Sequence, residues 1–188
     1  MQDKKLKLFF YYIIIIIYLE FIFKIFTFKK MFNIGSLYTF LFAISIALLL
    51  QLIGNFFGPK FNKISTYVIT VVLIILFAFN YIHHKLFSTI FSFYSIGLAD
   101  QAWDFRGVVL SQIINSWLQL ILMFIPLILL IIFRKKLQFH PLKPKKKVLI
   151  AILVLISYFV SILALLPNKD KIYSPYQMYF LINDSTVS

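Results

Sequence analysis

The chain contains no cysteine and only six acidic residues among its 188. The absence of cysteine excludes disulfides and a thiol nucleophile. Charged residues make up 13% of the chain and hydrophobic residues 62%, whereas an ordinary soluble domain is about a quarter charged and about half apolar. With a mean hydropathy of +0.93, this composition excludes a soluble fold and predicts an all-α integral membrane protein.

The 19 basic residues give a net charge of +13 and lie in clusters between apolar runs. Membrane orientation and anionic lipid headgroups explain such clusters better than nucleic acid does, so we expect membrane lipids as partners and no nucleic acid. The densest cluster, residues 134–147, reads RKKLQFHPLKPKKK. Because Lys and Arg near the ends of spans favour the cytoplasmic side, we predict that this hairpin is cytoplasmic.

Five apolar runs are long enough to cross a membrane: residues 8–28, 34–53, 64–82, 113–133 and 148–166. The first resembles a signal sequence, but it is too long and is followed by Lys29 and Lys30 instead of a small-residue cleavage site, so we predict an uncleaved span. Pro126 predicts a kink in the fourth span, because proline removes a helical hydrogen bond.

The segment between the third and fourth spans, residues 83–112, differs from its neighbours. Its apolar part is about 14 residues, too short to span, which predicts an extracytoplasmic interfacial or re-entrant helix. Four polar residues recur in it at helical spacing: Lys85, Ser88, Ser92 and Ser95.

The charge distribution supports five spans with the amino terminus in the cytoplasm. Twelve basic residues then lie inside: Lys4, Lys5, Lys7, Lys60, Lys63 and the seven of the hairpin. Six lie outside: Lys29, Lys30, Lys85, Arg106, Lys169 and Lys171. We therefore predict a multi-pass cell-membrane protein with a membrane domain (residues 1–166), followed by the start of an extracytoplasmic linker (residues 167–188).

Two groups of polar residues within the spans are candidate sites. Glu20 and Lys24 are four residues apart in the favourable order for a helical ion pair, and a charge at mid-membrane costs about 2.5–3.5 kcal/mol. Gln112, Asn115 and Gln119 form a stripe at i, i+3 and i+7 in the fourth span. Both groups are explained by contacts between helices. The alternative is that Glu20, Lys24, Asn115 and Gln119 contact the headgroup of an outer-leaflet lipid.

The sequence predicts neither a metal site nor a catalytic residue. His83 and His84 are adjacent and so point about 100° apart on a helix, while His140 lies on the cytoplasmic hairpin. The chain contains no nucleophile elbow, Walker loop or zincin helix.

Three stretches carry a resemblance to a known family: YLEFIFK (residues 18–24), FSFYSIGLADQ (91–101) and YSPYQMYFLIND (173–184). With five spans, an external segment before the fourth and an outward tail, the chain resembles the membrane domain of the lipoteichoic acid synthase family. Members of that family transfer glycerol phosphate from phosphatidylglycerol to a growing polymer in Gram-positive bacteria.

The resemblance implies a sulfatase-like catalytic domain outside the cell, after the fifth span, with a threonine nucleophile and a manganese ion. None of the family's catalytic or metal residues has a counterpart here. We therefore expect an amino-terminal fragment that anchors this catalytic domain and guides phosphatidylglycerol to it, and that is inactive and cofactor-free by itself.

The alternative is a self-contained membrane protein, such as a transporter subunit or an accessory scaffold. Transporters often contain paired repeats, but five spans do not divide evenly and the sequence has no internal repeat. A reading frame that continues into a metal-binding domain would favour the first hypothesis.

Overall fold

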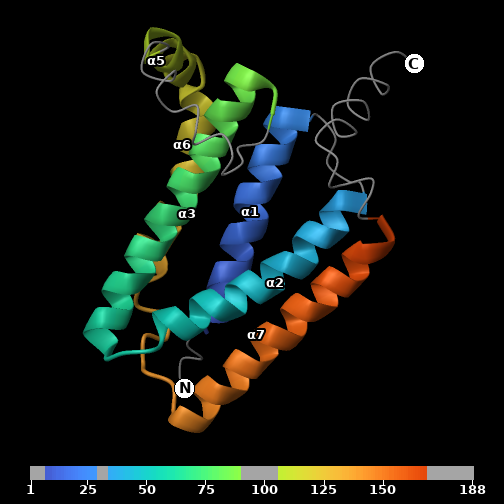
Figure 1. The fold of residues 1–188 in the computed structure, drawn as a ribbon. Helices are drawn as coiled ribbons and strands as arrows, with labels where there is room; N and C mark the ends of the chain where they lie inside the picture. Colours follow the sequence, from blue (N-terminus) through green and yellow to red (C-terminus); the bar gives the residue numbers. More distant parts are fainter. Residues whose placement is uncertain (1–6, 29–33, 90–105, 169–188) are drawn as a thin grey trace.

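The computed structural model describes residues 7–28, 34–89 and 106–168 (Figure 1). These residues form α1 (Leu8–Phe28), α2 (Ile34–Gly54), α3 (Pro59–Phe87), α5 (Arg106–Asn115), α6 (Trp117–Phe133) and α7 (Pro144–Leu165). A short 3-10 helix, Leu166–Asn168, follows α7.

Four of these helices, α1, α2, α3 and α7, are long and apolar enough to cross a membrane. The pair α5 and α6 also meets this test when taken together, although the two helices are bent by 71° at the break between them. The prediction of a helical membrane protein is therefore confirmed.

The ends of α1 and α2 agree with the predicted spans to within one residue, but α3 and α7 begin earlier than predicted. α3 begins at Pro59 instead of residue 64, and α7 begins at Pro144 instead of residue 148. Proline suits the first helical position because its φ is preset and its missing N–H has no helical partner there. α3 also continues beyond residue 82 to Phe87, where Ser88 adopts a left-handed conformation (φ 55°) and donates its N–H to the His84 carbonyl.

The predicted fourth span, residues 113–133, is not a single continuous helix, contrary to the prediction. The helix breaks at Ser116, whose φ of −104° and ψ of 14° end α5 before α6 begins. The Ser116 N–H still reaches back to the carbonyls of Gln112 (3.0 Å) and Ile113 (3.2 Å). The 71° bend thus falls at Ser116, whereas the predicted kink residue, Pro126, lies buried within α6.

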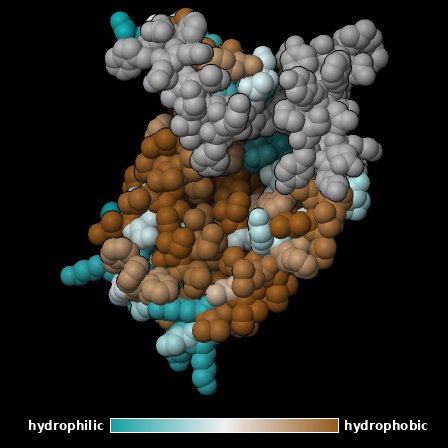
Figure 2. Space-filling model, viewed as in Figure 1, coloured by the Kyte–Doolittle hydropathy of each residue, from teal (hydrophilic) through white to brown (hydrophobic). Residues whose placement is uncertain are grey.

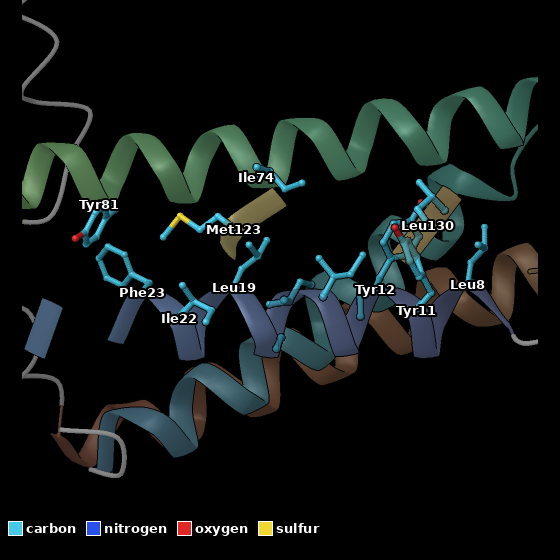
Figure 3. Close-up of a cluster of buried hydrophobic side chains, with 14 of the residues drawn as sticks. Leu8, Tyr11, Tyr12, Leu19, Ile22, Phe23, Ile74, Tyr81, Met123 and Leu130 are labelled. Atoms are coloured by element: carbon cyan, nitrogen blue, oxygen red, sulfur yellow. The ribbon is translucent and has the colours of Figure 1, made fainter. Parts of the chain in front are cut away.

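α1 lies at the centre of the bundle, in contact with α2, α3 and α6 (Figures 1 and 3). Its buried side chains meet those of α3 and α6 in one apolar core, in which Leu19, Ile74 and Met123 are fully buried (Figure 3). α7 instead packs chiefly on α2 and leaves most of its apolar side chains exposed. The broad hydrophobic surface in Figure 2 is the kind that lipid covers in a membrane protein.

Successive long helices run in opposite directions, so the connections alternate between the two ends of the bundle (Figure 1). The start of α1, the α2–α3 turn and the α6–α7 loop share one end, which we call the basic end. The described basic residues at this end are Lys7, Lys60, Lys63, Arg134, Lys135, Lys136, Lys143, Lys145, Lys146 and Lys147. Near the opposite end, the described basic residues are Lys85 and Arg106, in addition to Lys24 within α1.

Candidate functional site

Glu20 and Lys24 form an ion pair on α1 that also binds α2. The Lys24 Nζ lies 3.2 Å from the Glu20 Oε1 and donates to the Thr39 Oγ1 at 3.2 Å. The Thr39 hydroxyl donates to the same Glu20 oxygen at 3.3 Å, which closes a triangle between the two helices. The Lys24 and Glu20 side chains keep 14% and 24% of their surface exposed.

This triangle has the contacts expected of an ion pair packed between helices. The opposite charges compensate each other in a largely apolar setting, which reduces the cost of placing either one in the membrane. The triangle lies in the half of α1 farther from the basic end, because it follows Leu8 by three turns or more. The contact of Glu20 and Lys24 with a lipid headgroup stays a prediction.

The bend at Ser116 divides the polar stripe that was predicted for one continuous helix. Gln112 and Asn115 belong to α5 and Gln119 belongs to α6, so the three side chains do not share a helical face. The Gln112 Nε2 donates to the Ser116 Oγ at 2.9 Å, and Asn115 is exposed. The Gln119 Oε1 is buried without a hydrogen-bond partner among the residues that the structure describes.

The predicted interfacial helix begins differently in the structure. Lys85 lies in the last turn of α3, with its Nζ 5.7 Å from the centre of the Tyr81 ring, and Ser88 caps that helix. Ser92 and Ser95 lie outside the described residues. The serine and lysine spacing therefore starts on α3 and not on a separate helix. In the described parts of the chain, no three His, Cys, Asp or Glu side chains are grouped so as to hold a metal ion.

The most extensive polar network among the described residues lies at the basic end, where the sequence predicted no site. The Asn55 Nδ2 donates to the carbonyls of Gln138 (3.1 Å) and His140 (2.9 Å), and the Leu142 N–H donates to the Asn55 carbonyl (3.0 Å). Asn55 is 4% exposed. The α2–α3 turn thus binds the backbone of the basic α6–α7 loop directly.

Asn62 makes a second connection between the same two segments. Its Nδ2 donates to the carbonyls of Phe57 (2.8 Å) and Phe139 (2.9 Å), and its Oδ1 accepts the Phe57 N–H (2.9 Å). We call the contacts of Asn55 and Asn62 with these loops the asparagine clamp. Asparagine in a turn is ordinary, so the only signal in the sequence was that both residues lie beside long apolar runs.

A row of buried polar groups continues from the clamp into the bundle. Asn62, Thr66 and Thr70 follow one another at four-residue spacing on α3, and each is fully buried. The two threonine hydroxyls donate to the carbonyl four residues earlier, both at 2.8 Å, and the Tyr11 hydroxyl lies 3.0 Å from the Thr70 Oγ1. These bonds satisfy the hydroxyls within the apolar interior and attach α1 to α3.

Comparison with known proteins gives no relative: no family model, no curated protein and no solved structure matches the chain. The resemblance to the lipoteichoic acid synthase family therefore depends on the residues quoted above.

Proposed function

We propose that this chain is a five-span membrane anchor with its basic end in the cytoplasm. In this proposal it positions a glycerol phosphate transferase resembling lipoteichoic acid synthase and gives phosphatidylglycerol a path to it. The single observation that carries the proposal is the uneven distribution of charged groups along the bundle. Most of the described cations gather at one end, while the Glu20–Lys24 ion pair, with the sole carboxylate side chain among the described residues, lies in the other half.

The lengths of α5 and α6 support five spans. The 17 residues of α6 extend about 26 Å at 1.5 Å per residue, close to the ~30 Å thickness of the hydrocarbon core. α6 can then cross by itself, and α5, bent from it by 71°, lies close to the membrane plane as an interfacial helix. Trp117, at the junction, is 61% exposed, as expected for an aromatic residue at the membrane–water boundary.

Five antiparallel spans place the two ends of the membrane domain on opposite sides. With the basic end held in the cytoplasm, α7 finishes on the outer side, where a following domain would meet outer-leaflet lipid. Gln119, in the first turn of α6, is then at the depth of the upper acyl chains, whereas Glu20 lies near the midpoint of α1. Gln119 is the better candidate of the two for a lipid contact, because its side chain is partly exposed near the outer end of α6.

A crosslinking experiment tests the lipid path. The chain is reconstituted into vesicles that contain phosphatidylglycerol with a photoactivatable group near the headgroup, and labelled peptides are mapped after illumination. We expect labelling of the outer part of α6, and we expect Gln119→Leu to reduce it several-fold. Asn80→Leu is the matched control, because the Asn80 amide donates within its own helix, to the Leu76 carbonyl at 2.8 Å. Equal labelling of wild type, Gln119→Leu and Asn80→Leu would contradict the proposed path.

An activity measurement tests the anchoring role. The chain alone, supplied with phosphatidylglycerol and manganese, should release no more diacylglycerol than protein-free vesicles. Release well above that background would contradict a purely anchoring function.

A further inference from the structure

The α2–α3 turn exposes three phenylalanines at the end of the bundle that is otherwise basic. Phe56, Phe57 and Phe61 are 46%, 52% and 53% exposed. Their rings stack edge to face, with centroids 5.0 Å apart for Phe56 and Phe57 and 4.6 Å apart for Phe57 and Phe61. This is a continuous aromatic surface that the core of the protein does not use.

Lysines surround the aromatic surface. Lys60 and Lys63 are exposed in the first turns of α3, beside Phe61. From α7, the Lys147 Nζ lies 4.1 Å from the centre of the Phe56 ring and donates to the Phe56 carbonyl at 2.8 Å. We call these six residues the aromatic–basic patch: Phe56, Phe57, Phe61, Lys60, Lys63 and Lys147.

The asparagine clamp fixes the shape of this patch. Asn62, within the patch segment, bonds both the N–H and the carbonyl of Phe57, and its further bond to Phe139 attaches the turn to the α6–α7 loop. A surface that is already ordered loses little conformational entropy when a ligand binds. The backbone that carries Phe57 is therefore held in a defined arrangement.

The length of α3 places the patch at the membrane surface. Its 29 residues extend about 44 Å, which exceeds the ~30 Å hydrocarbon thickness, so an upright α3 reaches the interfacial regions at its ends. The stretch of α3 without charged residues begins at Ile64, and the patch directly precedes it. The rings thus lie at the depth where phenylalanine enters the boundary between headgroups and acyl chains.

From these observations we infer that the aromatic–basic patch is a binding site for anionic phospholipid in the adjacent leaflet. The rings pack on the upper acyl chains, and Lys60 and Lys63 contact the headgroup phosphates. Charge complementarity favours this occupant: among the described residues the sole carboxylate side chain is that of Glu20, in the other half of the bundle. The inference requires only that this end meets a bilayer surface, and it is independent of the transferase proposal.

Spin-labelled lipids test the selectivity. The chain is reconstituted into phosphatidylcholine vesicles, and electron paramagnetic resonance gives the protein-associated fraction of spin-labelled phosphatidylglycerol and phosphatidylcholine. We expect a preference for phosphatidylglycerol that Lys60→Gln/Lys63→Gln lowers about five-fold or more, since each cation near an anionic surface contributes about that factor. Arg134→Gln/Lys135→Gln removes the same charge outside the patch and should have a clearly smaller effect. Raising the salt concentration should weaken the wild-type preference, because the lysines are exposed.

A fluorescence measurement tests the depth of the rings. Phe57→Trp is introduced after Trp103 and Trp117 have been replaced by phenylalanine, so that the new indole is the only one. Quenching by lipid brominated near the top of the acyl chains, with little quenching by aqueous iodide, is the expected result. Strong iodide quenching, or an unchanged lipid preference in Lys60→Gln/Lys63→Gln, would overturn the inference. The inference would also be overturned if the indole were protected from iodide only after a soluble acidic polypeptide is added, because this result would identify a protein partner instead.

Discussion

Replacing Asn62 with alanine tests the packing of the basic end most directly. The Asn62 side chain is fully buried and makes three hydrogen bonds, two to Phe57 and one to Phe139. Alanine removes all three bonds and separates the α2–α3 turn from the α6–α7 loop at this point. We expect the variant to insert and remain helical, because the apolar spans are unchanged, but to be less stable.

The structure sets the size of this effect. A hydrogen bond contributes about 1 kcal/mol net, and a buried polar group left without a partner costs about 1–3 kcal/mol. Phe57 is half-exposed, so water can replace part of what its backbone loses, and we expect a total loss of about 2–4 kcal/mol. Asn62→Asp keeps the shape but removes both donated bonds and places an oxygen beside the Phe57 and Phe139 carbonyls, so it should cost at least as much as alanine.

Unfolding by sodium dodecyl sulfate in bicelles, followed by circular dichroism, measures the free energy. Asn80→Ala is the matched control, because its amide bonds only the preceding turn of its own helix, and it should change stability by less than about 0.5 kcal/mol. If Asn62→Ala changes the free energy of unfolding no more than Asn80→Ala does, or if Asn62→Asp is as stable as wild type, the clamp does not stabilise the fold.

Three further predictions concern other contacts. Gly54→Ala should destabilise the protein by about 1–3 kcal/mol in the same assay, because a Cβ there would lie 2.8 Å from the buried Tyr12 Oη. A neutral effect would show that α1 can shift away from α2 at little cost. Glu20→Ala should lower the free energy of unfolding by about 2 kcal/mol, because the largely buried Lys24 loses its carboxylate. Exchanging Glu20 and Lys24 should lower it less, and equal losses in the two variants would argue against an ion pair. In intact cells, a single cysteine at His140 should resist an impermeant maleimide until the membrane is permeabilised, and immediate labelling would invert the proposed orientation.

Hydrophobicity alone was enough to predict α1 and α2. Both are continuous apolar runs, and the structure ends them within one residue of the predicted limits. Hydropathy was less informative for α3 and α7, because it marks the part of a helix that lies in hydrocarbon and not the whole helix. The signal for their true starts was local: Pro59 and Pro144 each occupy the first helical turn.

The break at Ser116 had no comparable signal in the sequence. Proline is the usual cause of a kink, so Pro126 was the natural prediction, yet proline is tolerated within membrane helices where neighbouring groups compensate for its missing N–H. Ser116 is neither proline nor glycine, and it is buried at 2% exposure with its hydroxyl accepting from Gln112. The bend therefore depends on how this residue packs against the rest of the bundle, which helical periodicity does not record.

The candidate site was predictable only where it was local. Glu20 and Lys24 are four residues apart on one helix, and their spacing alone indicated the pair. Thr39, which completes the triangle, comes from another helix and carries no distinguishing pattern. The asparagine clamp joins the two loops through residues 77 to 87 positions apart, so nothing in the spacing of Asn55 and Asn62 could identify these partners.

The clamp also gives a reason for topology that is independent of charge. Asn55 and Asn62 are buried, and their hydrogen bonds to the 138–142 backbone can form only if the α2–α3 turn and the α6–α7 loop reach the same side of the membrane. An inverted insertion of α6 and α7 would remove the bonds that Asn55 and Asn62 make to this loop, and it would also transfer the lysine-rich loop across the bilayer. The charges favour the orientation of the loop during insertion, and the clamp then makes the same orientation a condition of folding. Neutralising the loop lysines should therefore weaken the preference for one orientation during insertion. In the molecules that fold, the α2–α3 turn and the α6–α7 loop should still lie on the same side of the membrane.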